Sequence, residues 1–186
     1  MHRLFALSLF CLVILGGCNT SSDKKETAKW KVVNSRNFSV RLPSYLKQAT
    51  ELHDDAVMQY QNVIKEFYFI VIQEPTAEFN DMFYRGELED EYTPNIDGYA
   101  RLIGDRFSEN VDTVYQKTAL KPIIIDGKDG RYFEANAKVG TVDVHYHYGF
   151  VRGDTTYYQL LSWTLMDKAS KYNDTMSNIL HSFKEK

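Results

Sequence analysis

The segment Phe67-Tyr-Phe-Ile-Val-Ile72 is apolar at every position, and it constrains the fold more than any other feature of this sequence. Side chains along a β-strand alternate between its two faces. A strand without polar positions is therefore expected to be covered on both faces. This segment predicts a β-sheet that lies between two layers.

Several other segments have the composition of strands and surround this buried one. They are residues 30–33, 38–42, 56–61, 113–117, 123–125, 132–137, 142–151 and 157–165. Asn34-Ser-Arg-Asn37 separates the first two, and Gly and Asp residues at 126–130, 139–140 and 152–154 separate the later ones, as tight turns require. We expect an opening hairpin and, after residue 111, an antiparallel meander.

Two segments have apolar residues at helical spacing. Thr93 as cap and Pro94 as first residue predict the start of one helix. A second helix is expected from about Asp167, as its cap, to Phe183. The acidic residues 74–92 between the buried strand and the first helix are interpreted as a connection with room for a short helix. The apolar stripes of the two helices are Ile96, Tyr99, Ala100, Ile103 and Phe107, and Ala169, Tyr172, Met176, Ile179 and Phe183.

The first 17 residues have the layout of a bacterial export signal. His2 and Arg3 precede a largely apolar run, residues 4–15, that is shorter than the roughly 20 residues a membrane helix needs. Leu15-Gly16-Gly17-Cys18 resembles the lipobox of bacterial lipoproteins, which implies cleavage before Cys18 and lipid on its thiol. The alternatives are an N-terminal membrane helix or an accidental cysteine. Residues 18–29 are polar and predict a flexible tether.

The composition that remains after cleavage excludes two classes of function. Loss of residues 1–17 removes one arginine and no acidic residue, which leaves 21 basic and 25 acidic residues. A chain of this charge without a basic stripe is not expected to bind nucleic acid. Cys11 leaves with the signal and Cys18 carries lipid, so residues 30–186, which suit one domain, have no thiol for disulfides, catalysis or metal ligation.

Two phrases of the sequence resemble the Mog1/PsbP-like family. Phe38-Ser-Val-Arg-Leu-Pro43 is similar to its opening strand, and Tyr157-Tyr-Gln-Leu-Leu-Ser-Trp-Thr164 with Ile179-Leu-His-Ser-Phe183 is similar to its last strand and helix. The resemblance implies an α+β fold, in which an antiparallel β-sheet has helices packed on both faces as an α/β/α sandwich. It also implies binding or assembly roles and no shared reaction.

Asp143-Val-His-Tyr-His147 is the best candidate for chemistry. Alternation along a strand places Asp143, His145 and His147 on one face, and two imidazoles with a carboxylate can bind zinc. The alternative is a polar or half-buried strand face. His53 and His181 could supply a third imidazole, but no sequence pattern brings them near.

These features favour a non-enzymatic binding or assembly module, tethered by lipid to the bacterial cell envelope. Asn19 after the cysteine favours the outer membrane if the organism is Gram-negative. An envelope protein or a small ligand is the expected partner. The alternatives are a metal-binding protein or metal-dependent hydrolase that uses Asp143, His145 and His147, and a structural envelope component. No Gly-x-Ser-x-Gly, His-Glu-x-x-His or Gly-rich phosphate loop is present.

Overall fold

The core of the fold is a large antiparallel sheet. The computed structural model describes residues 29–86, 88 and 91–186, so the predicted signal, Cys18 and most of the tether lie outside the described residues. The sheet has the strand order β3-β4-β5-β10-β9-β8-β6, and β7 also pairs with β8. Its strands are β3 (Lys47–Gln48), β4 (Ala56–Asn62), β5 (Phe67–Pro75), β6 (Thr113–Lys117), β7 (Lys121–Ile125), β8 (Lys128–Val139), β9 (Val142–Arg152) and β10 (Thr156–Leu165).

A small sheet forms from the two ends of the described chain. It has the order β1-β2-β11, with β1 (Trp30–Asn34), β2 (Phe38–Pro43) and β11 (Lys184–Glu185). The predicted opening hairpin is confirmed, because β1 and β2 pair antiparallel. The pairing of β11 with β2 joins the last residues to the first strands, which no local pattern predicted.

The predicted meander is confirmed from β7 to β10, and β6 departs from it. Asp126 and Gly127 both have positive φ, 54° and 74°, as a two-residue turn between β7 and β8 requires. The short strands β6 and β7 do not pair with each other. Instead β6 pairs with residues 135–138 of β8 and β7 with residues 128–132, so one 12-residue strand holds both along the same edge.

Three α-helices complete the fold: α1 (Thr76–Tyr84), α2 (Ile96–Glu109) and α3 (Ala169–His181). The predicted cap of α2 was wrong, because Asn95 caps it and accepts hydrogen bonds from the backbone of Asp97 and Gly98. The predicted cap of α3 was also wrong. Asp167 lies in a 3₁₀ turn, η1 (Met166–Lys168), and the following α3 has no side-chain cap.

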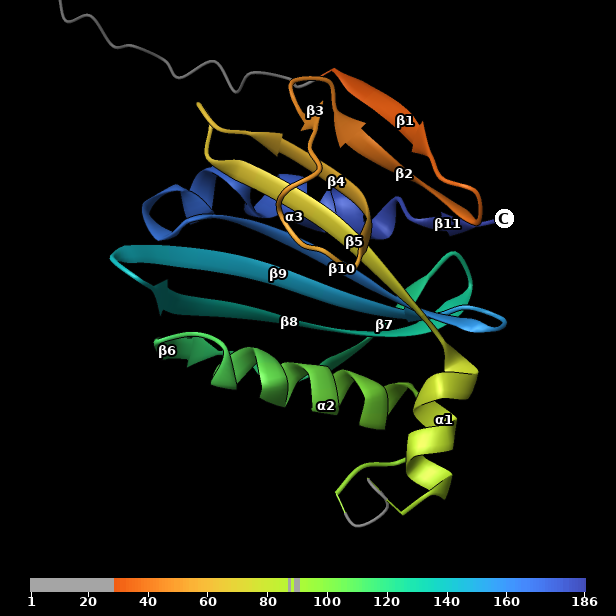
Figure 1. Ribbon diagram of the computed structural model, residues 1–186. Coiled ribbons are helices and arrows are strands. Elements are labelled where there is room, and N and C mark those ends of the chain that lie inside the picture. The colour runs from red at the N-terminus through yellow and green to blue at the C-terminus, as the bar shows by residue number, and fades with distance from the viewer. Residues whose placement is uncertain (1–28, 87, 89–90) are drawn as a thin grey trace, which may run out of the picture.

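Two hydrophobic clusters stabilise these elements. The first joins α3, the small sheet and residues such as Tyr158 and Leu160 of β10. The second joins α1, α2 and residues such as Tyr157 of β10. Neighbouring residues of a strand point to opposite faces, so the two clusters lie on opposite sides of β10. The α+β class with antiparallel sheets is confirmed, and Figure 1 shows α2 running along β8 and β9.

None of the helices in the described residues is long and apolar enough to cross a membrane.

Candidate metal centre

The candidate site lies on three neighbouring strands of the large sheet, β8, β9 and β10, on the face that α3 covers. In the register of these strands, His147 lies opposite Glu134 on one side and Ser162 on the other. His145 lies opposite Asn136 and Thr164. Directly opposed residues of an antiparallel pair share a face, as do residues two apart on one strand. All six polar side chains therefore form one patch on the same face of the sheet.

Four of these six side chains are buried on the side of the sheet that α3 covers. His145 and His147 are each only 6% exposed, and Ser162 and Thr164 are buried as well. Asn173 and Ser177, one turn apart on α3, line the same cavity as His147. The polar side of α3 therefore covers the polar patch, while Tyr172, Met176 and Ile179 enter the first hydrophobic cluster.

Glu134, His145 and His147 bring three metal-binding atoms together. One ligand atom from each residue lies within 4.8 Å of the other two. The distance from His147 Nε2 to Glu134 Oε2 is 3.7 Å. Ligands of a tetrahedral zinc ion at 2.0–2.1 Å are separated by about 3.4 Å. The three ligand atoms are therefore up to about 1.4 Å farther apart than in a bound zinc site, and the side chains would have to close on an ion to bind it.

One nitrogen atom of each histidine meets no hydrogen-bond partner among the described residues. By distance and angle, Nε2 of both histidines is buried without a hydrogen bond in the described part of the chain, although the Asn173 side chain lies near enough to His145 to act on its pKa as a hydrogen-bond partner. His145 Nδ1 lies 2.7 Å from Asn136 Oδ1, and with the amide in this orientation Nδ1 is the donor. This arrangement leaves the lone pair on Nε2, as in histidine ligands that donate their second nitrogen to an outer partner.

Burial keeps both imidazoles in the form that binds metals. It lowers the pKa of His147 to about 4, against the opposing effect of the Glu134 carboxylate. Burial also lowers the pKa of His145. Both rings are therefore neutral at pH 7, the form in which imidazole nitrogen binds a metal.

Two cavities adjoin the group and leave space beside it for a further ligand or a small molecule. One of about 70 Å³ includes Glu134, Asn136 and His145 in its lining. The other, of about 320 Å³, is lined by Ile123, Tyr132, Glu134, His147, Asn173, Asp174, Ser177, Leu180 and His181. The Glu134 side chain is 32% exposed, so an ion can reach the group without the fold opening.

The structure brings together two of the three residues predicted from the sequence. Asp143 is on the same strand but outside the group, because its carboxylate accepts a hydrogen bond of 2.7 Å from the Tyr115 hydroxyl. His181 lines the larger cavity, whereas His53 lies in the β3–β4 loop, where its Nδ1 accepts from the Asp55 backbone.

Glu134, and not the predicted Asp143, is the carboxylate of the group. The length of the turn between β8 and β9 could have identified it from the sequence. The β8–β9 turn has two residues, Gly140 and Thr141, so Val139 pairs with Val142. Counting back along both strands from that pair places residue 134 opposite residue 147. The register of this tight hairpin therefore predicts that Glu134 and His147 are neighbours.

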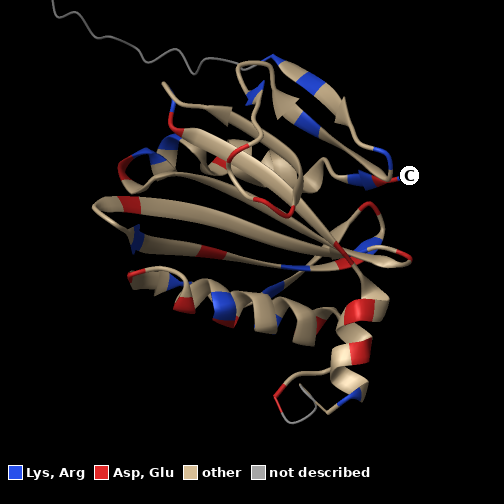
Figure 2. Ribbon diagram, viewed as in Figure 1, with Lys and Arg blue, Asp and Glu red and all other residues tan. Residues whose placement is uncertain are grey.

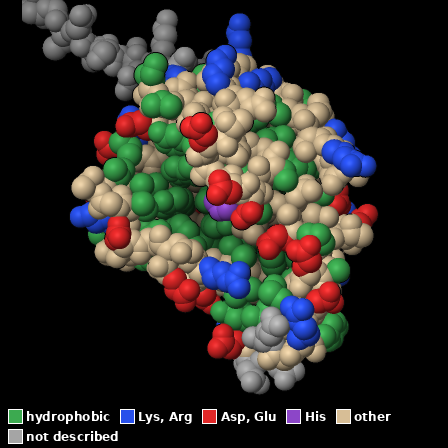
Figure 3. Space-filling model, in the orientation of Figure 1, with side chains coloured by type: hydrophobic (Ala, Val, Ile, Leu, Met, Phe, Trp, Pro, Cys, Tyr) green, Lys and Arg blue, Asp and Glu red, His purple; other side chains and the backbone are tan. Residues whose placement is uncertain are grey.

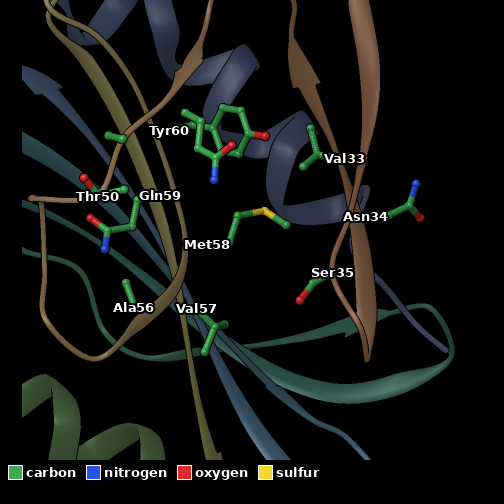
Figure 4. A pocket seen from close by; sticks show the side chains of 11 residues that line it. Val33, Asn34, Ser35, Thr50, Ala56, Val57, Met58, Gln59 and Tyr60 are labelled. Carbon is green, nitrogen blue, oxygen red and sulfur yellow. The ribbon is translucent and has the colours of Figure 1, made fainter.

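Two other surfaces have the shape of a site without its chemistry. A hollow of about 290 Å³ between the β1–β2 turn and β4 has no carboxylate or imidazole among its lining residues. Figure 4 shows Met58 of β4 extending into it toward Val33 and Ser35.

The second surface is a row of aromatic rings across three strands. Trp163 of β10 lies opposite Tyr68 of β5 and Tyr146 of β9, and its ring stacks on Tyr68 at 5.2 Å. All three are half-buried. Figure 3 shows hydrophobic side chains gathered in a hollow on the face seen in Figure 1. Such a row offers apolar area for packing but no ligand for a metal.

Comparison with known proteins shows the fold and no closer relationship. No family model and no curated protein matches the sequence. Cyanobacterial PsbP (CyanoP) from Synechocystis sp. PCC 6803 is similar in structure with a TM-score of 0.56 and 12% identity, over 92% of this chain and 99% of that one. LpqN of Mycobacterium tuberculosis, described as involved in cell envelope biogenesis, has a TM-score of 0.53 and 10% identity, over 87% of this chain and 92% of that one. The fold is therefore PsbP-like.

Proposed function

We propose that this chain is an exported, lipid-anchored module of the bacterial cell envelope that binds a divalent transition-metal ion, zinc by preference, at Glu134, His145 and His147. The observation that carries the proposal is the pair of buried Nε2 atoms without hydrogen-bond partners beside a carboxylate. An unsatisfied polar atom in the interior costs about 1–3 kcal/mol. A bound cation offsets that cost.

The envelope location rests on the lipobox at Leu15–Cys18 and on the fold. LpqN, a protein described as involved in cell envelope biogenesis, shares the PsbP-like fold, which is compatible with a non-enzymatic envelope role. Lipid on Cys18 would anchor the chain, in the outer membrane if the organism is Gram-negative. The partner in this proposal is the metal ion, together with an envelope protein or small ligand, and no nucleic acid.

We also infer that the domain has the three layers predicted from its sequence, with helices on both faces of the large sheet. The support is the alternation along β10, where Tyr158 and Leu160 belong to the cluster of α3 and Tyr157 to the cluster of α2. In this arrangement the metal centre lies inside a layer interface, between the sheet and α3.

The donor set favours zinc over alkaline-earth ions. Imidazole nitrogen with one carboxylate oxygen is typical of zinc sites, and magnesium and calcium prefer oxygen ligands throughout. Two histidines and a glutamate with an open fourth position also match the ligand set of catalytic zinc sites.

Calorimetric titration of the metal-free chain with zinc tests the proposal. We expect one ion per chain with micromolar or tighter affinity, and loss of binding in His145→Ala, His147→Ala and Glu134→Gln. His53→Ala and Asp143→Ala are the matched controls, because both residues lie outside the group. Zinc binding that survives His147→Ala, or no binding by the wild-type chain, would overturn the metal centre.

The lipid anchor has its own test. Labelled palmitate is expected in the wild-type chain, which should fractionate with membranes. Both properties should be lost in Cys18→Ser. An unlabelled wild-type chain in the soluble fraction would remove the anchor and leave the metal titration unaffected.

A metal-dependent hydrolase is the second candidate, and one observation favours it. The cavity of about 320 Å³ beside the group contains Glu134 and His147 together with Asp174 and His181. A zinc ion with three protein ligands and an open position can activate water. Ester or phosphodiester hydrolysis that needs zinc and disappears in His147→Ala would establish this role over simple binding.

A further inference from the structure

We propose that the turn between β4 and β5, with Val63 and Ile64 at its tip, and the basic segment 29–50 form a surface that contacts an anionic phospholipid bilayer. The partner is the membrane that holds the chain's own anchor, so the proposal rests on the lipid anchor of the proposed function. It is independent of the metal centre.

The tip presents two β-branched apolar side chains to solvent. Val63 is 62% exposed and Ile64 93% exposed, the highest value among the large hydrophobic residues described. Turns favour Gly, Asn, Asp, Pro and Ser, each for a conformational reason that Val and Ile do not provide. Folding therefore gives no reason for Val-Ile at this position, whereas insertion into an apolar phase does.

Hydrogen bonds hold this tip rigidly in place. Asn62 Oδ1 accepts from the backbone of Lys65 at 2.8 Å, and the Val63 carbonyl accepts from Glu66 N at 3.2 Å. The Asn62 amide also donates to the carbonyl of Tyr45 at 2.9 Å, which ties the turn to the segment before β3. A fixed tip pays little conformational entropy when it inserts.

The segment beside the tip has a charge opposite to that of the whole chain, and Glu66, the carboxylate in the turn itself, is paired with Lys168. Residues 29–50 contain five basic residues and no acidic one, although the chain has a formal net charge of −3. Figure 2 shows basic residues along β1, β2 and β3. Lys31 donates to the Leu46 carbonyl, and Lys65 lies 5.0 Å from the Tyr45 ring. Lys47 lies opposite Gln61 in the register of β3 and β4. Three lysines therefore surround the base of the tip.

The chain that leads from Cys18 reaches the domain at this same end. The Lys29 carbonyl accepts from Ser44 N at 2.7 Å, and the neighbouring Tyr45 accepts from Asn62. Figure 1 shows the start of β1 and the β4–β5 turn at one end of the molecule. The 11 peptide steps from Cys18 to Lys29 span at most about 40 Å. A lipid on Cys18 would therefore keep Lys29, at the same end of the molecule as the tip, within that distance of the bilayer.

An apolar tip surrounded by lysines fits a bilayer better than a protein surface. Apolar side chains at the headgroup boundary and lysines beside anionic lipids both contribute to membrane binding. Because the tip exposes both of its apolar side chains, it suits insertion between lipid headgroups. Each lysine near an anionic membrane is expected to strengthen binding roughly fivefold.

Vesicle sedimentation of the unlipidated chain tests the surface. The Cys18→Ser chain, made without residues 1–17, is mixed with vesicles of phosphatidylcholine with or without phosphatidylglycerol. We expect binding only with phosphatidylglycerol, and a loss of roughly fivefold in Ile64→Ser and in Lys47→Gln. Ile124→Ser and Lys121→Gln are the matched controls, because Ile124 is 62% exposed and Lys121 is exposed, both on β7 and outside this surface.

A fluorescent probe gives a second readout that does not depend on strong binding. A polarity-sensitive dye on Ile64→Cys in the same chain should shift to the blue on these vesicles and be quenched by spin-labelled lipids, and a dye on Ile124→Cys should not. Equal behaviour of the two positions, or equal losses in Ile64→Ser and Ile124→Ser, would overturn the proposal. Palmitate labelling tests the anchor separately, so the two failures are distinguishable.

Discussion

His147 of β9 lies directly opposite Glu134 of β8, with its Nε2 atom 3.7 Å from Glu134 Oε2 and without a hydrogen bond among the described residues. Two residues along, His145 lies opposite Asn136 and is held by it at 2.7 Å. The same strand register therefore places two of the candidate ligands side by side and gives the third, His145, its hydrogen-bond partner.

Asn136 is expected to strengthen zinc binding by orienting His145, without contacting the ion itself. Removal of its hydrogen bond in Asn136→Ala frees the His145 ring to rotate and to change tautomer, which typically weakens metal affinity about 10–100-fold. Competition with a fluorescent zinc chelator measures the change. Gln116→Ala is the control, because Gln116 lines the same small cavity without that bond. An unchanged affinity in Asn136→Ala would mean that His145 is not oriented through Nδ1.

His147→Leu is expected to stabilise the metal-free protein while abolishing zinc binding. Leucine has a similar volume and removes a buried Nε2 atom that has no partner, a gain of about 1 kcal/mol in the free energy of unfolding. Urea unfolding in the presence of a chelator measures this gain. With zinc at 100 times its dissociation constant, the wild-type chain should instead be more stable by about 2.7 kcal/mol than without it. A metal-free variant less stable than wild type would indicate that His147 is a packing residue.

The ion pair between Asp97 and Arg131 is expected to make the stability of the fold fall in acid. Arg131 Nε and Nη2 donate to the two carboxylate oxygens at 2.5 and 2.7 Å, and this hydrogen bonding lowers the pKa of Asp97 from its ordinary 3.8. A lowered pKa stabilises the fold above pH 3.8, and the contribution is lost as the pH falls through the folded-state value.

Asp97→Asn should therefore cost up to about 1 kcal/mol at pH 7, a small amount because Asp97 is half exposed. The difference from wild type should shrink below pH 4 in chemical unfolding followed across pH, where about 3.9 is the usual pKa of an unfolded aspartate. Asp55→Asn, in the exposed β3–β4 loop, is the control. A difference that stays constant down to pH 2 would contradict an ionic origin.

Gly149→Ala is expected to displace α3 from the sheet. A Cβ atom at residue 149 of β9 would lie 2.1 Å from Leu180 Cδ1. Leu180 belongs to α3 and is buried where this helix contacts β9. Overpacking of this kind typically costs about 1–3 kcal/mol. Thermal unfolding measures the loss, and Gly149→Ala/Leu180→Ala should be less destabilised than the sum of its single changes. Strict additivity would show that the two residues do not meet.

Local patterns were sufficient for most of the elements. Alternation and turn residues predicted β7 to β10, because a two-residue turn and a period of two leave few other structures for such segments. Helical spacing predicted α2 and α3 but misplaced their caps. The polar residues Thr93, Asn95 and Asp167 all suit a cap, and only the path of the chain into the helix decides which one reaches the free backbone N–H groups.

The sequence by itself determined that residues 145 and 147 share a face of one strand, because the strand period is a property of the backbone. Only the tertiary structure decided that Glu134, and not Asp143, completes the group. That choice depends on which strands are neighbours and on which helix covers them: β8 places Glu134 beside His147, while Tyr115 of β6 holds Asp143 at the edge. Burial beneath α3 then lowered the pKa of His147, an effect of solvent exclusion by residues distant in sequence that no local pattern encodes.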